Sequence, residues 1–180
     1  MSSNPYAAPK ARVDDAPAPD ATAYFPVSRL KLMLMSFATL GLYEVYWFYK
    51  NWKAMQATGE KLNAPVRAVF YPVTAYWFFR HLRSRAEAAG VGAGFHAGGL
   101  AVALFVISAV TWQLPDPWWL TGYASFLVLL PVRGAIERIN RKVAPDADRN
   151  ARFSGWNIFG LVLGALMLAL IILGMVLPQE

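Results

Sequence analysis

An uncharged stretch near the C-terminus decides which environment this chain folds in. No charged residue occurs from Phe153 to Gln179, and the apolar run Asn157–Leu177 within it is 21 residues long. A helix needs about 20 predominantly apolar residues to cross the hydrocarbon core of a bilayer. The run therefore predicts a membrane-spanning helix over 157–177, which Pro178 ends.

The composition of the whole chain agrees with a membrane environment. Hydrophobic residues make up 57% of the 180 residues and charged residues only 16%, whereas soluble domains carry about 25% charged residues. A small soluble domain cannot hide so much apolar surface, because its ratio of surface to volume is high. We therefore predict an all-α fold, a polytopic transmembrane helical bundle formed by residues 27–180.

Four further apolar segments precede the last one, which gives four or five membrane segments in total. Together with the last one, these segments are expected at about 30–49, 65–80, 97–114, 118–132 and 157–177. Segment 65–80 has only 12 uncharged residues between Arg67 and Arg80, too few for a straight span. It is either a short span kinked at Pro72 or a half-inserted helix.

The first 26 residues form a separate region. Five of the twelve prolines lie there, among alanines and aspartates and with few large aliphatic residues. Such a segment cannot bury enough apolar surface to offset the entropy of ordering. Residues 1–26 are therefore predicted to be a disordered tail, and they lack the apolar core of a signal peptide.

The basic residues predict an orientation for the rear half. Six of them lie between Arg133 and Arg152, and the tryptophan-rich turn at 113–119 has none. Because lysine and arginine accumulate on the cytoplasmic side, the loop 133–156 is predicted to be cytoplasmic, with the turn and the C-terminus outside. Within this loop, 133–143 is amphipathic and is predicted to be an interfacial helix.

The front half of the chain, which contains the segments 30–49 and 65–80, leaves three topologies open. Two spanning segments place 13 basic residues inside and four outside, and a single span gives the same division. Two re-entrant or interfacial segments place all 17 inside. The positive-inside rule favours this third topology, although re-entrant segments are rarer than spans. We expect a cytoplasmic tail, as the first and third topologies require.

Glu44 lies deep in an apolar segment and is a candidate functional residue. A carboxylate within a membrane segment needs a partner, and Arg67, Arg80 or Arg133 could supply one. The candidate intramembrane polar site is therefore Glu44 with Arg67 and Arg80. In the alternative interpretation, Gly41 breaks the helix and Glu44 lies at the membrane interface beside the aromatic residues.

Aromatic residues and glycines form two further patterns. Tryptophan and tyrosine accumulate at both membrane interfaces, so seven are predicted to be interfacial anchors: Tyr43, Tyr46, Trp47, Trp52, Trp112, Trp118 and Trp119. Gly160 and Gly164 form a GxxxG motif, which lets two helices approach closely. Packing within the bundle and homodimerisation are both compatible with this motif, and we expect packing within the bundle.

The aromatic stretch also carries a resemblance. Residues 39–52 read Thr-Leu-Gly-Leu-Tyr-Glu-Val-Tyr-Trp-Phe-Tyr-Lys-Asn-Trp, which resembles the signature of a family of bacterial membrane proteins with a domain of unknown function. The family core is Gly-Leu-Tyr-x-x-Tyr-Trp, and weaker similarity covers most of 27–177. The resemblance implies a location in the bacterial inner membrane. It brings no activity and no catalytic residues.

The residues themselves show no chemistry. No combination of nucleophile, base and acid is evident, the chain has no cysteine, and its two histidines lie in different environments. We therefore predict a structural or interaction component of the bacterial inner membrane that is not an enzyme and needs no cofactor. Its predicted partners are anionic lipid headgroups at the basic loops and a second copy or another membrane protein, not nucleic acid.

Two other functions stay open. One is a small-solute transporter or channel that uses Glu44 and an intramembrane arginine as a polar pathway. The other is a lipid-modifying enzyme with its site at the cytoplasmic interface. A transporter requires Glu44 in a water-filled cavity, and an enzyme requires several polar groups that converge in a pocket.

Overall fold

The computed structural model describes residues 23–177, and within this range the chain is helical without strands. The helices in chain order are α1 (Arg29–Ala38), α2 (Leu42–Ala57), α3 (Ala64–Val69), α4 (Tyr71–Ala88), α5 (Ala97–Val110), the 3-10 helices η1 (Thr111–Gln113) and η2 (Trp118–Ser125), α6 (Phe126–Val143) and α7 (Gly155–Val176). The predicted all-α class is confirmed. Most of the predicted disordered tail, 1–22, lies outside the described residues.

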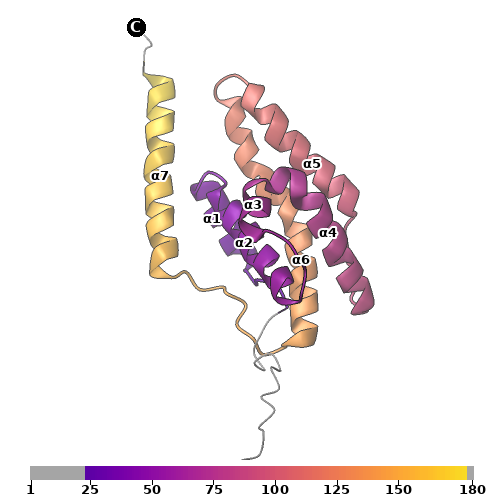
Figure 1. Cartoon of the computed structure of the whole chain (residues 1–180). Coiled ribbons are helices and arrows are strands. Elements are labelled where there is room, and N and C mark those ends of the chain that lie inside the picture. Colours follow the sequence, from indigo (N-terminus) through magenta and orange to yellow (C-terminus); the bar gives the residue numbers. More distant parts are fainter. Residues whose placement is uncertain (1–22, 178–180) are drawn as a thin grey trace, which may run out of the picture.

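Within residues 23–177, two helices are long and apolar enough to cross a membrane. They are the continuous helix Trp118–Val143, which combines η2 and α6, and α7. A third apolar helix, Ala97–Gln113, is shorter. Helix α7 (yellow in Figure 1) stands beside the other helices, and Gly164 is its one buried residue. An exposed apolar surface of this extent needs a cover such as lipid or a partner protein.

The apolar segment expected at 30–49 is two helices rather than one. Helix α1 ends at Ala38, and Leu40 and Gly41 adopt positive φ angles of 52° and 84° before α2 begins. Glycine adopts this left-handed conformation without strain, so it ends one helix and starts the next. The chain then reverses, because Asn51 of α2 returns to bind the backbone of Phe25, just ahead of α1.

The segment expected at 65–80 is also divided. The short helix α3 ends at Val69, and α4 begins at Tyr71 and continues past Arg80 to Ala88. Pro72 lies in the first turn of α4, where its missing N–H costs nothing. Pro72 therefore helps to begin a helix and does not kink one.

The segment expected at 118–132 and the amphipathic segment at 133–143 form one continuous helix, through η2 and α6. The basic half of α6 is therefore a direct extension of its apolar half. Helix α5 packs beside both α4 and α6, and η1 lies against η2 at the turn (Figure 1).

Aromatic side chains from α2 and α4 form the centre of the core. Trp47, Phe48 and Trp52 are completely buried and surround Phe78, whose ring centroid lies 5.9 Å from that of Trp47 and 5.7 Å from that of Phe48. Helix α6 adds Leu129, Val132 and Ile136 to the same core. The front half is thus packed against α6 through this aromatic core.

Candidate functional site

Glu44 is completely buried in the first turn of α2. The hydroxyl of Ser125, the last residue of η2, donates a hydrogen bond of 2.8 Å to its Oε1. The hydroxyl of Tyr71, at the start of α4, lies beside the same two residues. The other carboxyl oxygen, Oε2, has no hydrogen-bond partner among the described residues. Glu44 therefore connects three helices through neutral groups.

The structure does not bring together the three residues of the predicted polar site. Within residues 23–177, no cation lies within ion-pair distance of Glu44. The guanidinium of Arg67 lies over the ring of Trp52, 4.8 Å from the ring centroid. Arg80 lines a hollow between α4 and α5 instead. Gly41 does separate two helices, as the alternative interpretation expected, and Glu44 is buried within the protein.

Three of the seven predicted interfacial anchors are core residues. Tyr43, Trp47 and Trp52 are buried, so their rings cannot reach lipid headgroups, and this part of the prediction is corrected. The periodicity of α2 carries the missed signal. Its buried positions recur every three or four residues, as on one face of a helix: Tyr43, Glu44, Trp47, Phe48, Asn51, Trp52 and Met55.

The other four predicted anchors reach the surface. Tyr46 is exposed, Trp112 is 87% exposed and Trp118 is also exposed, the last two on either side of the turn between η1 and η2. Trp119 is partly exposed, and its Nε1 donates a hydrogen bond of 2.6 Å to Asp116. Because these side chains are at least partly exposed, their role as headgroup anchors stays a prediction.

The predicted GxxxG motif faces α1. A Cβ atom on Gly160 would lie 3.6 Å from the Met35 side chain, and one on Gly164 would overlap the backbone of Ala38. The contact is therefore within one chain.

A group of polar side chains holds the extended segment 24–27. We call Asn51, Arg133, Asn140 and Asn150 the polar collar. Asn140 of α6 both accepts a hydrogen bond from the Tyr24 N–H (3.0 Å) and donates one to the Tyr24 carbonyl (2.9 Å).

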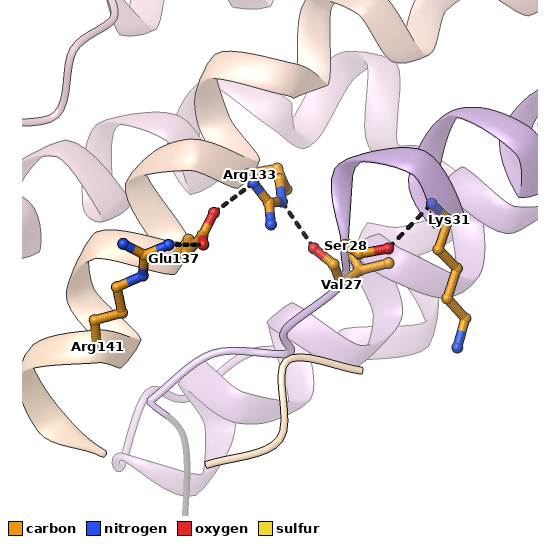
Figure 2. Close-up of polar contacts among 6 residues, drawn as sticks. All are labelled: Val27, Ser28, Lys31, Arg133, Glu137 and Arg141. Carbon is orange, nitrogen blue, oxygen red and sulfur yellow. Dashed lines mark hydrogen bonds and ion pairs between the residues drawn. The ribbon is translucent and has the colours of Figure 1, made fainter. Parts of the chain in front are cut away.

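The rest of the polar collar binds the next three residues. Asn51 accepts from the N–H of Phe25 (3.1 Å), and Asn150 donates to the carbonyl of Pro26 (3.0 Å). Arg133 donates from Nε to the carbonyl of Val27 at 2.7 Å (Figure 2). Buried backbone groups need such partners, so these side chains fix the start of the fold against α6.

Lys31 extends the polar collar to the loop between α6 and α7. Its ammonium donates hydrogen bonds to Oδ1 of Asn150 (2.7 Å) and to the carbonyl of Arg152 (2.8 Å). Burial lowers the pKa of Lys31, and the nearby charge of Asp148 opposes this lowering. On the other side of the collar, Glu137 pairs with both Arg133 and Arg141 (Figure 2).

The patterns in the sequence did not indicate the collar asparagines as a site. Asn51 and Asn140 are isolated polar residues on the buried faces of α2 and α6, which is the one local signal that could have found them. Among the described residues, no group of His, Asp and Glu side chains could hold a metal ion.

Comparisons with protein-family models, with curated proteins and with solved structures found no match to this chain. The family resemblance of residues 39–52 therefore stays a prediction.

Proposed function

We propose that the chain is a structural or interaction component of the bacterial inner membrane, without catalytic activity of its own, whose basic end lies among the headgroups of the cytoplasmic leaflet. The observation that supports this proposal is the distribution of charge over the fold. Lysine and arginine are absent from η1, η2, the turn between them and α7, whereas residues 133–143 of α6, two of which belong to the polar collar, are rich in them. Such a division matches the positive-inside rule.

The contacts of α6 support a cytoplasmic origin for the front half. Tyr24, near its start, binds Asn140, and Ala93, near its end, accepts a hydrogen bond of 2.6 Å from Arg138. Asn140 and Arg138 lie two residues apart, so the front half begins and ends at the same end of α6. It therefore makes no net crossing between residues 24 and 93.

The length of α1 favours a re-entrant helix over a span in the segment 30–49. Helix α1 has ten residues and rises about 15 Å, half of the hydrocarbon thickness. After Gly41 the chain turns back toward Phe25. In the proposed topology the membrane is crossed by α5 with η1, by η2 with α6, and by α7, so that the tail is cytoplasmic and the C-terminus is outside.

The surroundings of Glu44 weigh against the transporter or channel. Its Oε1 accepts a hydrogen bond from the Ser125 hydroxyl. The hollows at the polar collar and between α4 and α5 are lined by other residues, so Glu44 faces neither of them. In proteoliposomes we expect the wild-type chain and Glu44→Gln to show the same low permeability to protons and small solutes. A solute flux that disappears with Glu44→Gln would refute the proposal in favour of transport.

Single cysteines test the topology, because the native chain has none. In intact cells, a membrane-impermeant thiol reagent should label Asp116→Cys, at the turn, but not Asp148→Cys or Glu60→Cys. Glu60 separates the re-entrant topology from two spans, since it follows α2 and would lie outside if both segments 30–49 and 65–80 crossed the membrane. All three should be labelled after permeabilisation. Labelling of Glu60→Cys in intact cells would contradict the re-entrant topology, and labelling of Asp148→Cys would reverse the orientation.

A purification tests the interaction role. The intact protein, extracted in mild detergent, should retain anionic lipids and migrate with a second copy or with one membrane protein in a fixed ratio. A monomer that retains neither lipid nor protein would contradict this role.

A further inference from the structure

A polar hollow of about 350 Å³ lies between α4 and the start of α5. Six of the side chains that line it can form hydrogen bonds or ion pairs: Tyr76, Arg80, Arg83, Ser84, Glu87 and His96. The hollow is open to the surface, and the function proposed above does not use it. In the proposed topology it lies on the cytoplasmic side, because the helices α4 and α5 are joined there by the loop that binds Arg138.

Of the two arginines in the hollow, one has no ion-pair partner among the described residues and can bind an anion. Nε of Arg83 donates to Oε1 of Glu87 at 2.8 Å, so these two charges neutralise each other. Arg80 forms no ion pair with any of residues 23–177. The hollow therefore has a net positive charge, and a guanidinium group matches the oxygen geometry of a phosphate.

The neighbouring groups in the hollow are hydrogen-bond donors. Nδ1 of His96 accepts a hydrogen bond of 3.0 Å from the N–H of Gly99, so the neutral imidazole carries its proton on Nε2, where it can donate. Tyr76 and Ser84 contribute hydroxyl groups. An anion with several acceptor oxygens fits this set of donors better than a neutral or cationic ligand.

An apolar stripe continues from the hollow toward the turn between η1 and η2. Val73 and Tyr76 are three residues apart on α4, and Gly98, Val102 and Phe105 have the spacing of one face of α5. Val73, Val102 and Phe105 are all exposed, Val102 by 62%. The two helices lie side by side (Figure 1). A ligand bound in the hollow would therefore have apolar surface directly beside it.

We propose that the hollow binds the phosphate group of an anionic phospholipid, with Arg80 as the principal cation and the stripe of Val73, Val102 and Phe105 against its acyl chains. A phosphate alone would use the hollow but not the stripe, so the stripe favours a lipid over a free anion. The physiological leaflet of this lipid rests on the proposed topology, whereas its binding does not.

Lipid binding to the purified full-length chain in detergent tests the site. The thermal midpoint is followed while short-chain phosphatidylglycerol, phosphatidylcholine or inorganic phosphate is added, since a ligand of the folded state raises it. Phosphatidylglycerol should raise the midpoint at lower concentration than phosphatidylcholine. Arg80→Gln should weaken the phosphatidylglycerol affinity on the order of tenfold, as the loss of a charged hydrogen-bond partner does.

Two further variants make the result specific. Arg149→Gln removes an exposed cation outside the hollow and should bind the lipid as the wild type does. Val102→Gln, also at an exposed position, should weaken the binding of phosphatidylglycerol. An equal loss for Arg80→Gln and Arg149→Gln would show a diffuse charge effect and overturn the site. An equal response to inorganic phosphate and to the lipid, unchanged in Val102→Gln, would overturn the lipid as its ligand.

The lipid assay tests the binding site and the cysteine labelling tests the topology, so one proposal can be refuted without the other. Absence of phosphatidylglycerol selectivity with the expected labelling pattern would refute the site and leave the proposed topology intact. A reversed labelling pattern with selective binding would refute the topology and keep the lipid site. If Arg80→Gln does not fold, Arg80→Lys, which keeps the charge but loses the paired donors, gives the same comparison with a smaller expected loss.

Discussion

The carbonyl oxygen of Ala38, the last residue of α1, lies in the space that a Cβ atom on Gly164 would need. One turn earlier, Gly160 faces Met35 of the same helix and Thr39, which follows its last residue. These contacts bring α7 to the bundle, and most of the other side chains of α7 are exposed. The two glycines therefore set how closely the last helix can approach the fold.

Replacing Gly164 should displace α7. We expect Gly164→Leu to lower the free energy of unfolding by about 1–3 kcal/mol, as overpacking at a close contact does. Gly174→Leu is the matched control, because nothing lies within 4 Å of a Cβ at that position of the same helix. Thermal unfolding in detergent measures the stability of both variants. Equal midpoints would show that the Gly164 contact with α1 does not stabilise the fold.

Glu44 should tolerate glutamine better than alanine. In Glu44→Gln the amide oxygen can still accept from Ser125, and no cation is left unpaired, so the free energy of unfolding should change by less than about 1 kcal/mol. Glu44→Ala removes the acceptor and leaves a cavity, and we expect it to cost about 2–4 kcal/mol.

A double-mutant cycle separates the Ser125 contact from the arginine partner expected from the sequence. Glu44→Ala with Ser125→Ala should show coupling of about 0.5–1.5 kcal/mol, whereas Glu44→Ala with Arg67→Gln or Arg80→Gln should show none. Coupling to either arginine would mean that the ion pair forms after all.

Loss of the Asn140 side chain should loosen the start of the fold. Asn140→Leu leaves the buried N–H and carbonyl of Tyr24 without their partners, at an expected cost of about 1–3 kcal/mol. Hydrogen exchange of the peptide that contains residues 24–27 should become faster. Asn63→Ala, at the exposed start of α3, is the control and should leave that exchange unchanged; equally slow exchange in Asn140→Leu would contradict the role of the collar.

Two tryptophans that look alike in the sequence should differ in their effect on stability. Trp47→Ala removes a completely buried ring that packs against Phe48 and Phe78, and core tryptophans cost about 3–5 kcal/mol when truncated. Trp112→Ala removes an exposed ring and should leave the unfolding midpoint in detergent almost unchanged. A larger loss for Trp112 than for Trp47 would restore the anchor interpretation of the aromatic stretch.

The sequence predicted those parts of the fold that depend on a local pattern. The uncharged run at 157–177 corresponds to α7, and the amphipathic segment 133–143 is the second half of α6, because length and periodicity alone specify such helices. For the segment 30–49, the prediction of one continuous helix was wrong. Its apolar length looks like one span, and only the alternative interpretation, in which Gly41 breaks the helix, anticipated the division at Leu40 and Gly41.

The candidate site depended on distant residues, and this part could not be predicted. Ser125, which binds Glu44, is 81 positions away in the chain, and Tyr24 and Asn140 are 116 apart. Hydropathy also does not distinguish a tryptophan that faces lipid from one that faces the core. For α2 the three-to-four-residue spacing of the buried positions distinguishes them, and it places Trp47 and Trp52 inside.

The turn between η1 and η2 has a consequence for how the chain enters the membrane during synthesis. Asp116 is its one charged residue. In the proposed topology, no lysine or arginine of the described chain has to leave the compartment in which the ribosome works. Moving a cation outward against an inside-negative potential costs about 2.3 kcal/mol per 100 mV, and an anion gains the same amount. The membrane potential would therefore assist the insertion of the α5–α6 hairpin through the single carboxylate at its tip.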